Sequence, residues 1–138
     1  MSDNTVTKPR EVVPGRAGNY YKPDNGTNAI YCRAASGAFQ DAGEIEIQEE
    51  KVRFFAEEHG YGDCAVYRDN GESGNTLDRP GMMALLDNIR AGDVKRVIVR
   101  DITRLARDYI LLQKLIDLFV EYGVELVSVG DSGVISLV

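Results

Sequence analysis

From residue 28 onwards, short apolar runs alternate with longer stretches in which apolar residues recur at helical spacing. The short runs predict strands, and the periodic stretches predict amphipathic helices. A glycine, which commonly ends a helix, follows each periodic stretch. The pattern therefore predicts strands over residues 28–33, 63–68, 95–100 and 124–129, and helices over residues 44–59, 80–91 and 103–122.

Strands that alternate with helices usually form a mostly parallel sheet with helices on both faces. We therefore predict an α/β fold of the doubly wound kind. In such folds, ligands bind beyond the carboxyl ends of the strands. Polar segments follow three of the predicted strands, over residues 33–40, 69–79 and 101–107, and we expect the chemistry there.

The predicted helix over residues 103–122 has two arginines near its start. Arg104 and Arg107 are three positions apart, so they are expected to share one face of the first turn. Helix starts favour acidic residues, because the helix dipole is positive there. A phosphate bound between the arginines explains their position, and a solvated arginine face is the alternative. Apolar residues of this stretch expected to face inward are Leu105, Tyr109, Leu112, Leu115, Ile116 and Phe119.

The first 27 residues differ in character from the rest of the chain. They are polar, rich in Gly, Asn and Pro, and show no periodicity. We expect residues 1–27 to form a flexible extension. We expect residues 28–138 to form one domain with a core of its own.

The net charge of −6 argues against a free-standing, nonspecific DNA-binding protein. The charge is uneven, however. Residues 41–60 carry seven acidic and two basic residues, whereas residues 95–108 carry five basic and two acidic residues. We therefore expect one face of the domain to be able to meet a polyanion. The chain has no apolar run of membrane-spanning length and no N-terminal signal, so we expect a cytoplasmic protein without membrane contact.

Cysteine and histidine do not form a metal-binding pattern in this chain. Cys32 and Cys64 fall in predicted strands, and we expect them to be reduced core residues. The single histidine, His59, is expected at the surface near a helix end, where a cation is favourable. A glycine-rich phosphate loop is also missing. We therefore expect neither a metal nor an organic cofactor.

The three polar segments carry a resemblance when they are taken together. Residues 31–40 read YCRAASGAFQ, residues 69–81 read DNGESGNTLDRPG, and residues 103–107 read TRLAR. In this order and spacing they resemble the catalytic domain of the serine recombinases, the resolvase/invertase family. The large serine integrases and transposases look most similar. The resemblance covers roughly residues 28–131.

The resemblance implies a DNA recombinase that cuts and rejoins DNA through a serine nucleophile. In this family the serine hydroxyl attacks the scissile phosphate, forms a 5′-phosphoserine linkage and releases a 3′-hydroxyl, without a metal. Guanidinium groups supply the fixed positive charge that such a transition state needs. The catalytic arginines implied by the motifs are Arg33, Arg79, Arg104 and Arg107, and the implied DNA-phosphate contacts are Ser73, Tyr31 and Gln40.

The nucleophile is where this chain departs from the family pattern. The family serine comes two residues after the first arginine, and here that position is Ala35. Ser36 follows one residue later, and Gln40 stands four after Ser36, which is the family's spacing for its glutamine. In one alignment a residue has been inserted and Ser36 is the nucleophile. In the other the nucleophile is lost, and the chain is a catalytically degenerate recombinase-fold module with a binding or regulatory role.

The resemblance also implies partners for this chain. The family continues beyond the catalytic domain into a long dimerisation helix and a separate DNA-binding domain, which we expect to be absent from residues 28–138. We therefore expect weak DNA binding by this fragment alone, and a homodimer or tetramer in the full-length context. A weaker alternative, without a motif behind it, is a flavodoxin-like protein that binds a small phosphorylated ligand.

Overall fold

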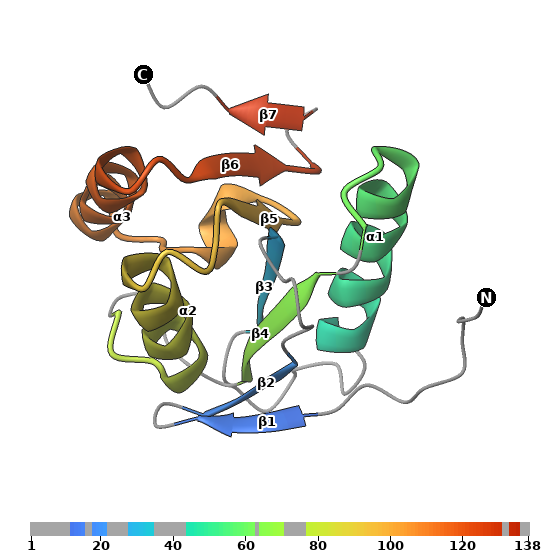
Figure 1. Ribbon diagram of the computed structural model, residues 1–138, viewed down its shortest axis with the longest axis horizontal. Coiled ribbons are helices and arrows are strands. Elements are labelled where there is room, and N and C mark those ends of the chain that lie inside the picture. The colour runs from blue at the N-terminus through green and yellow to red at the C-terminus, as the bar shows by residue number, and fades with distance from the viewer. Residues whose placement is uncertain are drawn as a thin grey trace.

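The computed structural model describes residues 12–15, 18–21, 28–34, 44–62, 64–70, 77–130 and 133–135. Within them the strands form one seven-stranded sheet of order β1-β2-β4-β3-β5-β6-β7 (Figure 1). The strands are β1 (Val12–Gly15), β2 (Gly18–Tyr21), β3 (Asn28–Ala34), β4 (Ala65–Asn70), β5 (Arg96–Val99), β6 (Glu125–Ser128) and β7 (Gly133–Ile135). The helices are α1 (Glu44–Glu58), α2 (Pro80–Arg90) and α3 (Tyr109–Glu121), with a 3-10 turn, η1 (Ile102–Arg104), before α3.

The central part of the sheet is parallel and has helices on both faces. Strands β4, β3, β5 and β6 pair in parallel, whereas β1, β2 and β7 add antiparallel pairs at the edges. Helix α1 lies on one face, and α2 and α3 lie on the other (Figure 1). The predicted α/β fold with a mostly parallel sheet is therefore confirmed.

Strand β3 lies at the centre of this sheet, and all seven of its residues are buried. Successive side chains of a strand point to opposite faces. Accordingly, Tyr31 packs in the core beneath α2 and α3, and Cys32 packs in the core beneath α1. Cys32 and Cys64 are both buried, as predicted, although β4 begins one residue after Cys64.

The segment predicted as one helix over residues 103–122 is in fact split in two, so that prediction was wrong in its first turn. Asp101 caps η1, because its side chain accepts a hydrogen bond from the Thr103 amide. Asp108 then caps α3 by accepting from the amides of Ile110 and Leu111. Each aspartate starts its own element, because an N-cap side chain satisfies backbone amides of the first turn. As a result, Arg104 lies in η1 and Arg107 in the connection, not on one face of a shared helical turn.

The split also changes which apolar residues of this segment are buried. Leu105, Leu115 and Phe119 are buried as predicted. Tyr109, which was expected to face inward, is 77% exposed, because it is the first residue of α3 rather than part of its second turn. Helix α3 contributes two buried residues, Leu115 and Phe119, to the core.

Part of the segment predicted as a flexible extension forms strands. Strands β1 and β2 make an antiparallel hairpin, with Gly15 opposite Gly18 at its closed end. Strand β2 then pairs with β4 through Tyr20–Tyr67 and Tyr21–Val66. Valine and tyrosine pairs favour strands, and the hairpin satisfies backbone groups at the edge of β4. Residues 12–15 and 18–21 of this segment are therefore part of the sheet.

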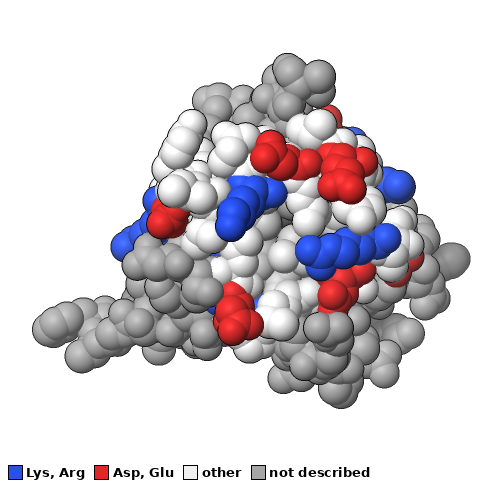
Figure 2. Space-filling model, turned by 90° about the vertical axis from the view of Figure 1, so that its left-hand side faces the viewer, with Lys and Arg blue, Asp and Glu red and all other residues white. Residues whose placement is uncertain are grey.

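The described surface of the α2–α3 side carries mixed charge. In Figure 2, basic and acidic side chains lie next to one another over this face instead of separating into patches. A polyanion would therefore meet no extended basic surface on the described part of this side. In addition, none of the helices in the described ranges has the length and apolar character needed to cross a lipid bilayer.

Candidate functional site

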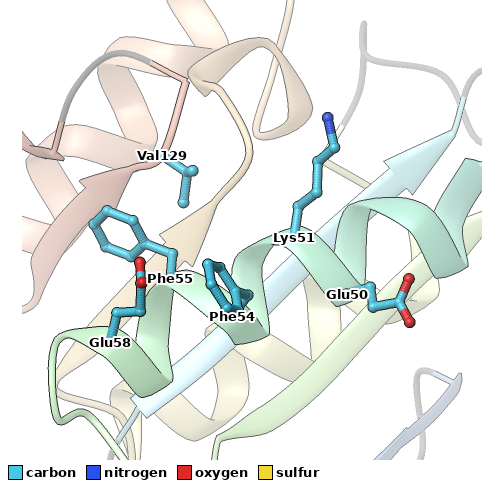
Figure 3. Close-up of a pocket in the computed structure, with 6 residues that line it drawn as sticks. All are labelled: Glu50, Lys51, Phe54, Phe55, Glu58 and Val129. Atoms are coloured by element: carbon cyan, nitrogen blue, oxygen red, sulfur yellow. The ribbon is translucent and has the colours of Figure 1, made fainter.

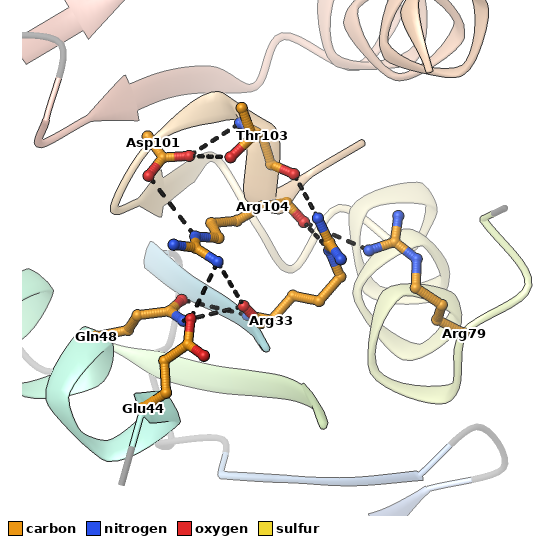
Figure 4. A network of polar contacts seen from close by, with 7 residues as sticks. All are labelled: Arg33, Glu44, Gln48, Arg79, Asp101, Thr103 and Arg104. Carbon is orange, nitrogen blue, oxygen red and sulfur yellow. Dashed lines mark hydrogen bonds and ion pairs between the residues drawn. The ribbon is translucent and has the colours of Figure 1, made fainter. Parts of the chain in front are cut away.

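The predicted arginines come together at the carboxyl ends of β3 and β5. Arg33 is the penultimate residue of β3, Arg79 directly precedes α2, and Arg104 ends the turn η1. Figure 4 shows the side chains of these three arginines converging on the segment that follows β5. Arg107 lies beyond η1 and is exposed. The predicted residues Ser36, Gln40 and Ser73, and also Ala35, lie outside the described residues.

Arg33 and Arg79 are buried cations that bind the same short stretch of backbone. The Arg33 side chain donates from Nε to the Arg104 carbonyl at 3.0 Å and from Nη2 to the Thr103 carbonyl at 2.6 Å. The Arg79 side chain donates to the Leu105 carbonyl and, at 3.4 Å, to the Arg104 carbonyl. Arg33 is 2% exposed and Arg79 is 0% exposed. These two guanidiniums therefore fix the backbone that carries Arg104.

The surroundings of Arg33 are electropositive. Burial lowers the pKa of its guanidinium, and the positive charges of Arg79, Arg107 and Arg104 lower that pKa further. The Tyr31 side chain acts in the opposite direction. A group of cations that disfavour one another in this way is stabilised by an anion placed among them.

A buried carboxylate, Asp69, connects these arginines to the start of α2. Its Oδ2 accepts from the Tyr31 hydroxyl at 2.6 Å and from the Met82 amide at 2.9 Å, and its Oδ1 accepts from the Gly81 amide at 2.7 Å. The Tyr31 hydroxyl in turn accepts from Arg79 Nη1 at 2.8 Å. Asp69 thus satisfies amides at the start of α2, where the N-cap residue, Arg79, gives the helix no side-chain capping bond.

Tyr31 was predicted to contact DNA phosphate, and the structure places it inside the core. It is 0% exposed, and its hydroxyl is bonded to Asp69 and Arg79. Burial, followed by the nearby Asp69 charge, raises the pKa of this hydroxyl above its ordinary range. In this arrangement Tyr31 supports Arg79 and stays a neutral phenol.

Arg104 lies close to two carboxylates. Its Nη1 lies 3.2 Å from Glu44 Oε2 of α1, and its Nε lies 3.6 Å from Asp101 Oδ2. It also donates to the Arg33 carbonyl at 3.3 Å. The Nε atom is buried and makes no hydrogen bond. Arg104 therefore bridges α1 and η1 through ion pairs, as Figure 4 shows.

Gln48 is a site residue that the sequence interpretation missed. Its side-chain Nε2 donates to the Arg33 carbonyl at 2.9 Å, and its Oε1 accepts from the Arg33 amide at 3.3 Å. It lies three residues after Ile45 and four before Val52, so it shares the buried face of α1. A polar residue on an apolar helix face was the signal that could have revealed it.

The described residues contain no group of three or more side chains suited to hold a metal ion. They do contain a hollow of about 520 Å³ beside α1, lined by Glu50, Lys51, Phe54, Phe55, Glu58 and Val129 (Figure 3). None of the arginines described above lines it. The arginine network and this hollow are therefore separate features of the described residues.

Comparison with known proteins agrees with this architecture. A family model described as the resolvase N-terminal domain matches residues 28–136. The N-terminal catalytic domain of TP901-1 integrase is 28% identical, with a TM-score of 0.67 over 76% of this chain and 79% of that one. The C-terminal catalytic domain of ISC1926 TnpA, an IS607-like serine recombinase, is 25% identical, with a TM-score of 0.67 over 74% of this chain and 69% of that one.

A resolvase family site-specific recombinase from Streptococcus pneumoniae shares the fold, with 24% identity and a TM-score of 0.67 over 78% of this chain and 74% of that one. The matched region contains the parallel strands and the three arginines that converge at their carboxyl ends. The chain therefore belongs to the resolvase family of serine recombinases and has the fold of their catalytic domain.

Proposed function

We propose that this domain cuts and rejoins DNA by phosphoryl transfer to a serine, with an arginine-lined site that uses no metal. The observation that carries the proposal is the convergence of Arg33, Arg79 and Arg104 at the carboxyl end of β3, just before the segment that contains Ser36. In α/β folds, ligands bind beyond the carboxyl ends of the parallel strands. The three arginines lie at this edge of the sheet, so they are well placed to act on one ligand.

The role proposed for each arginine follows from its surroundings. Arg104 and the exposed Arg107 are proposed to bind the scissile phosphate, because they are the members of the set that solvent can reach. Arg33 and Arg79 are proposed to act mainly by holding the backbone of residues 103–105 and by adding positive charge beneath it. Such preorganised charge stabilises a phosphoryl transition state.

Ser36 is proposed as the nucleophile, and Ser73 and Gln40 as phosphate contacts, on the motif match alone. In the proposed step, the Ser36 oxygen forms a bond to phosphorus and the 3′-oxygen of the neighbouring nucleotide leaves as a hydroxyl. Reversal of the step with a new 3′-hydroxyl rejoins the strand. DNA is the proposed substrate, and self-association of subunits is proposed to bring two strands together for exchange.

The alternative is a recombinase fold that has lost cleavage. The observation that favours it is the alanine, Ala35, two residues after Arg33, where the family has its serine. In this case the arginines would still bind a DNA phosphate without transferring it. The two functions make opposite predictions for covalent chemistry, so a single experiment separates them.

The test is to incubate the purified protein with a randomised duplex DNA library and to separate covalent adducts on a denaturing gel. The proposed enzyme forms adducts in the wild type and loses them in Ser36→Ala. The degenerate module forms none, and gains them only when Ala35→Ser restores the family spacing. Adducts that persist undiminished in Ser36→Ala would remove that residue from the mechanism.

A further inference from the structure

Two carboxylates from different parts of the chain hold the charge of Arg104. Glu44 comes from the first turn of α1, and Asp101 precedes η1. We propose that Glu44 is a counter-ion that holds Arg104 while the site is empty, and that an incoming DNA phosphate takes its place. This inference rests on the proposed phosphate-binding role of the arginines and adds a competitor for that phosphate.

The contacts of Arg104 are long and incomplete. The bond to Glu44 is 3.2 Å, the bond to the Arg33 carbonyl is 3.3 Å, and the approach to Asp101 is 3.6 Å. Charge-assisted bonds to guanidinium are typically shorter, about 2.7–2.9 Å. The buried Nε makes no hydrogen bond at all. A phosphate, which accepts two parallel bonds from one guanidinium, would satisfy Arg104 better than its present partners do.

The three arginines also differ in their freedom to move. Arg33 and Arg79 donate to backbone carbonyls and are almost completely buried. The Arg104 side chain is 17% exposed, and its carboxylate partners are 31% exposed at Glu44 and 29% at Asp101. Partly exposed ion pairs contribute little free energy, because water solvates both ions well when they separate. Replacing Glu44 by phosphate at Arg104 therefore costs little free energy.

The position of Glu44 favours a charged carboxylate next to Arg104 when no phosphate is bound. It lies at the positive end of the α1 dipole, which stabilises a carboxylate there. Its Oε2 also accepts from Gln48 Nε2 at 3.3 Å, the same atom that donates to the Arg33 carbonyl. A phosphate beside Arg104 would lie close to Glu44, and the two anions repel each other. Glu44 and phosphate are therefore expected to occupy Arg104 alternately.

The experiment uses this 138-residue chain with nitrogen-15 in its arginines. The Arg104 Nε–Hε signal is followed by nuclear magnetic resonance during titration with inorganic phosphate at low ionic strength, and then with a short DNA duplex. Glu44→Gln removes the carboxylate with little change of shape. Glu46→Gln, an exposed residue of the same helical turn, removes the same charge from α1 without touching Arg104 and serves as the control.

We expect Glu44→Gln to lower the phosphate concentration needed for half saturation at Arg104 by roughly two- to five-fold relative to Glu46→Gln, as for loss of a partly exposed ion pair. Asp101→Asn, which keeps an oxygen to cap η1, should change the affinity in the same direction. This second variant keeps the proposal testable if Glu44→Gln fails to fold.

Equal affinities in Glu44→Gln and Glu46→Gln would overturn the counter-ion role and leave phosphate binding at Arg104 intact. Weaker phosphate binding in Asp101→Asn would likewise overturn it. An Arg104 signal that responds to neither phosphate nor DNA in any protein would instead contradict the proposed function, and the counter-ion role would fail with it.

Discussion

The side-chain amide of Gln48 bonds both backbone polar groups of Arg33, accepting from its amide at 3.3 Å and donating to its carbonyl at 2.9 Å. Pairing between β3 and β5 ends earlier, at Tyr31–Val99. Beyond this pair, the side chain of Gln48 supplies hydrogen bonds to the β3 backbone at Arg33. Ala35 and Ser36 follow directly after the last residue of β3 in the chain.

Replacing Gln48 with methionine should therefore destabilise the domain. The substitution keeps the length of the side chain but leaves the buried amide and carbonyl of Arg33 without these bonds. The carbonyl still accepts from Arg104 at 3.3 Å, so we expect the free energy of unfolding to fall by about 1–3 kcal/mol, the typical cost of removing the bonds of one buried polar group. Urea denaturation measures it. Gln113→Met, at an exposed position of α3, should cost less than about 0.5 kcal/mol; equal losses in the two variants would contradict the role of Gln48.

Asp108→Ala should loosen the start of α3. Asp108 accepts from the Ile110 amide at 2.8 Å and from the Leu111 amide at 3.2 Å. Loss of such a cap costs about 1 kcal/mol, and thermal unfolding followed by circular dichroism should show it. Asp108→Asn keeps the accepting oxygen and should retain most of the stability. If both variants lose the same amount, the charge of Asp108 and not its cap is what matters.

The order of strands and helices could be predicted because burial leaves a different pattern of apolar residues along a strand than along a helix. Strand β3 is buried on both faces, so it reads as a continuous apolar run, and α2 shows its inward face at helical spacing. The break between η1 and α3 was missed because the apolar spacing runs through it. Only the capping by Asp101 and Asp108 marks the break, and capping depends on backbone geometry that an apolar pattern does not encode.

The arginines of the site could be predicted from the motifs, but their partners could not. Gln48 and Asp69 bond to groups 15 and 12 or more positions away in the chain, respectively. Contacts of this kind arise only when the sheet brings strand ends together. Glu44 gave even less signal, because an acidic residue in the first turn of a helix is ordinary. The strands β1 and β2 were missed because their stability depends on pairing with β4.

Gly81→Ala should push α2 away from β4. A Cβ at this position would lie 2.9 Å from the Arg68 carbonyl carbon, and closer still to its oxygen. Alanine is the better helix former by about 1 kcal/mol, yet this clash should reverse the sign and cost about 1–3 kcal/mol of stability. Urea denaturation tests it against Pro80→Ala, at the exposed neighbouring position, which should cost less than about 1 kcal/mol. A Gly81→Ala protein of unchanged or higher stability would contradict the close packing.

Alkaline pH should destabilise the domain through Cys32. Burial, with a smaller effect of the Glu49 charge, raises the pKa of its thiol from 9.0 to about 12. Above pH 9 the unfolded chain loses this proton while the folded protein keeps it. The contribution of the thiol to stability is thus complete below about pH 9 and is lost as the pH rises towards 12, at up to about 1.4 kcal/mol per pH unit.

The measurement is the free energy of unfolding between pH 7 and pH 11 in the wild type and in Cys32→Ala. The variant should show a shallower decline above about pH 9, although Tyr31, whose pKa is also raised by burial, leaves a remaining slope. Below that pH the two curves should run parallel. Identical slopes over the whole range would show that the Cys32 thiol titrates alike in the folded and unfolded states.

The central claim is that the arginine network serves phosphoryl transfer to Ser36. The most direct measurement is to digest the covalent protein–DNA adduct with trypsin and nuclease and to identify the nucleotide-bearing residue by mass spectrometry. The account predicts a phosphodiester-linked nucleotide on Ser36, absent from Ser36→Ala. A nucleotide on any other residue, or no adduct with cleavable DNA, would contradict it and leave a recombinase fold that binds phosphate without cutting.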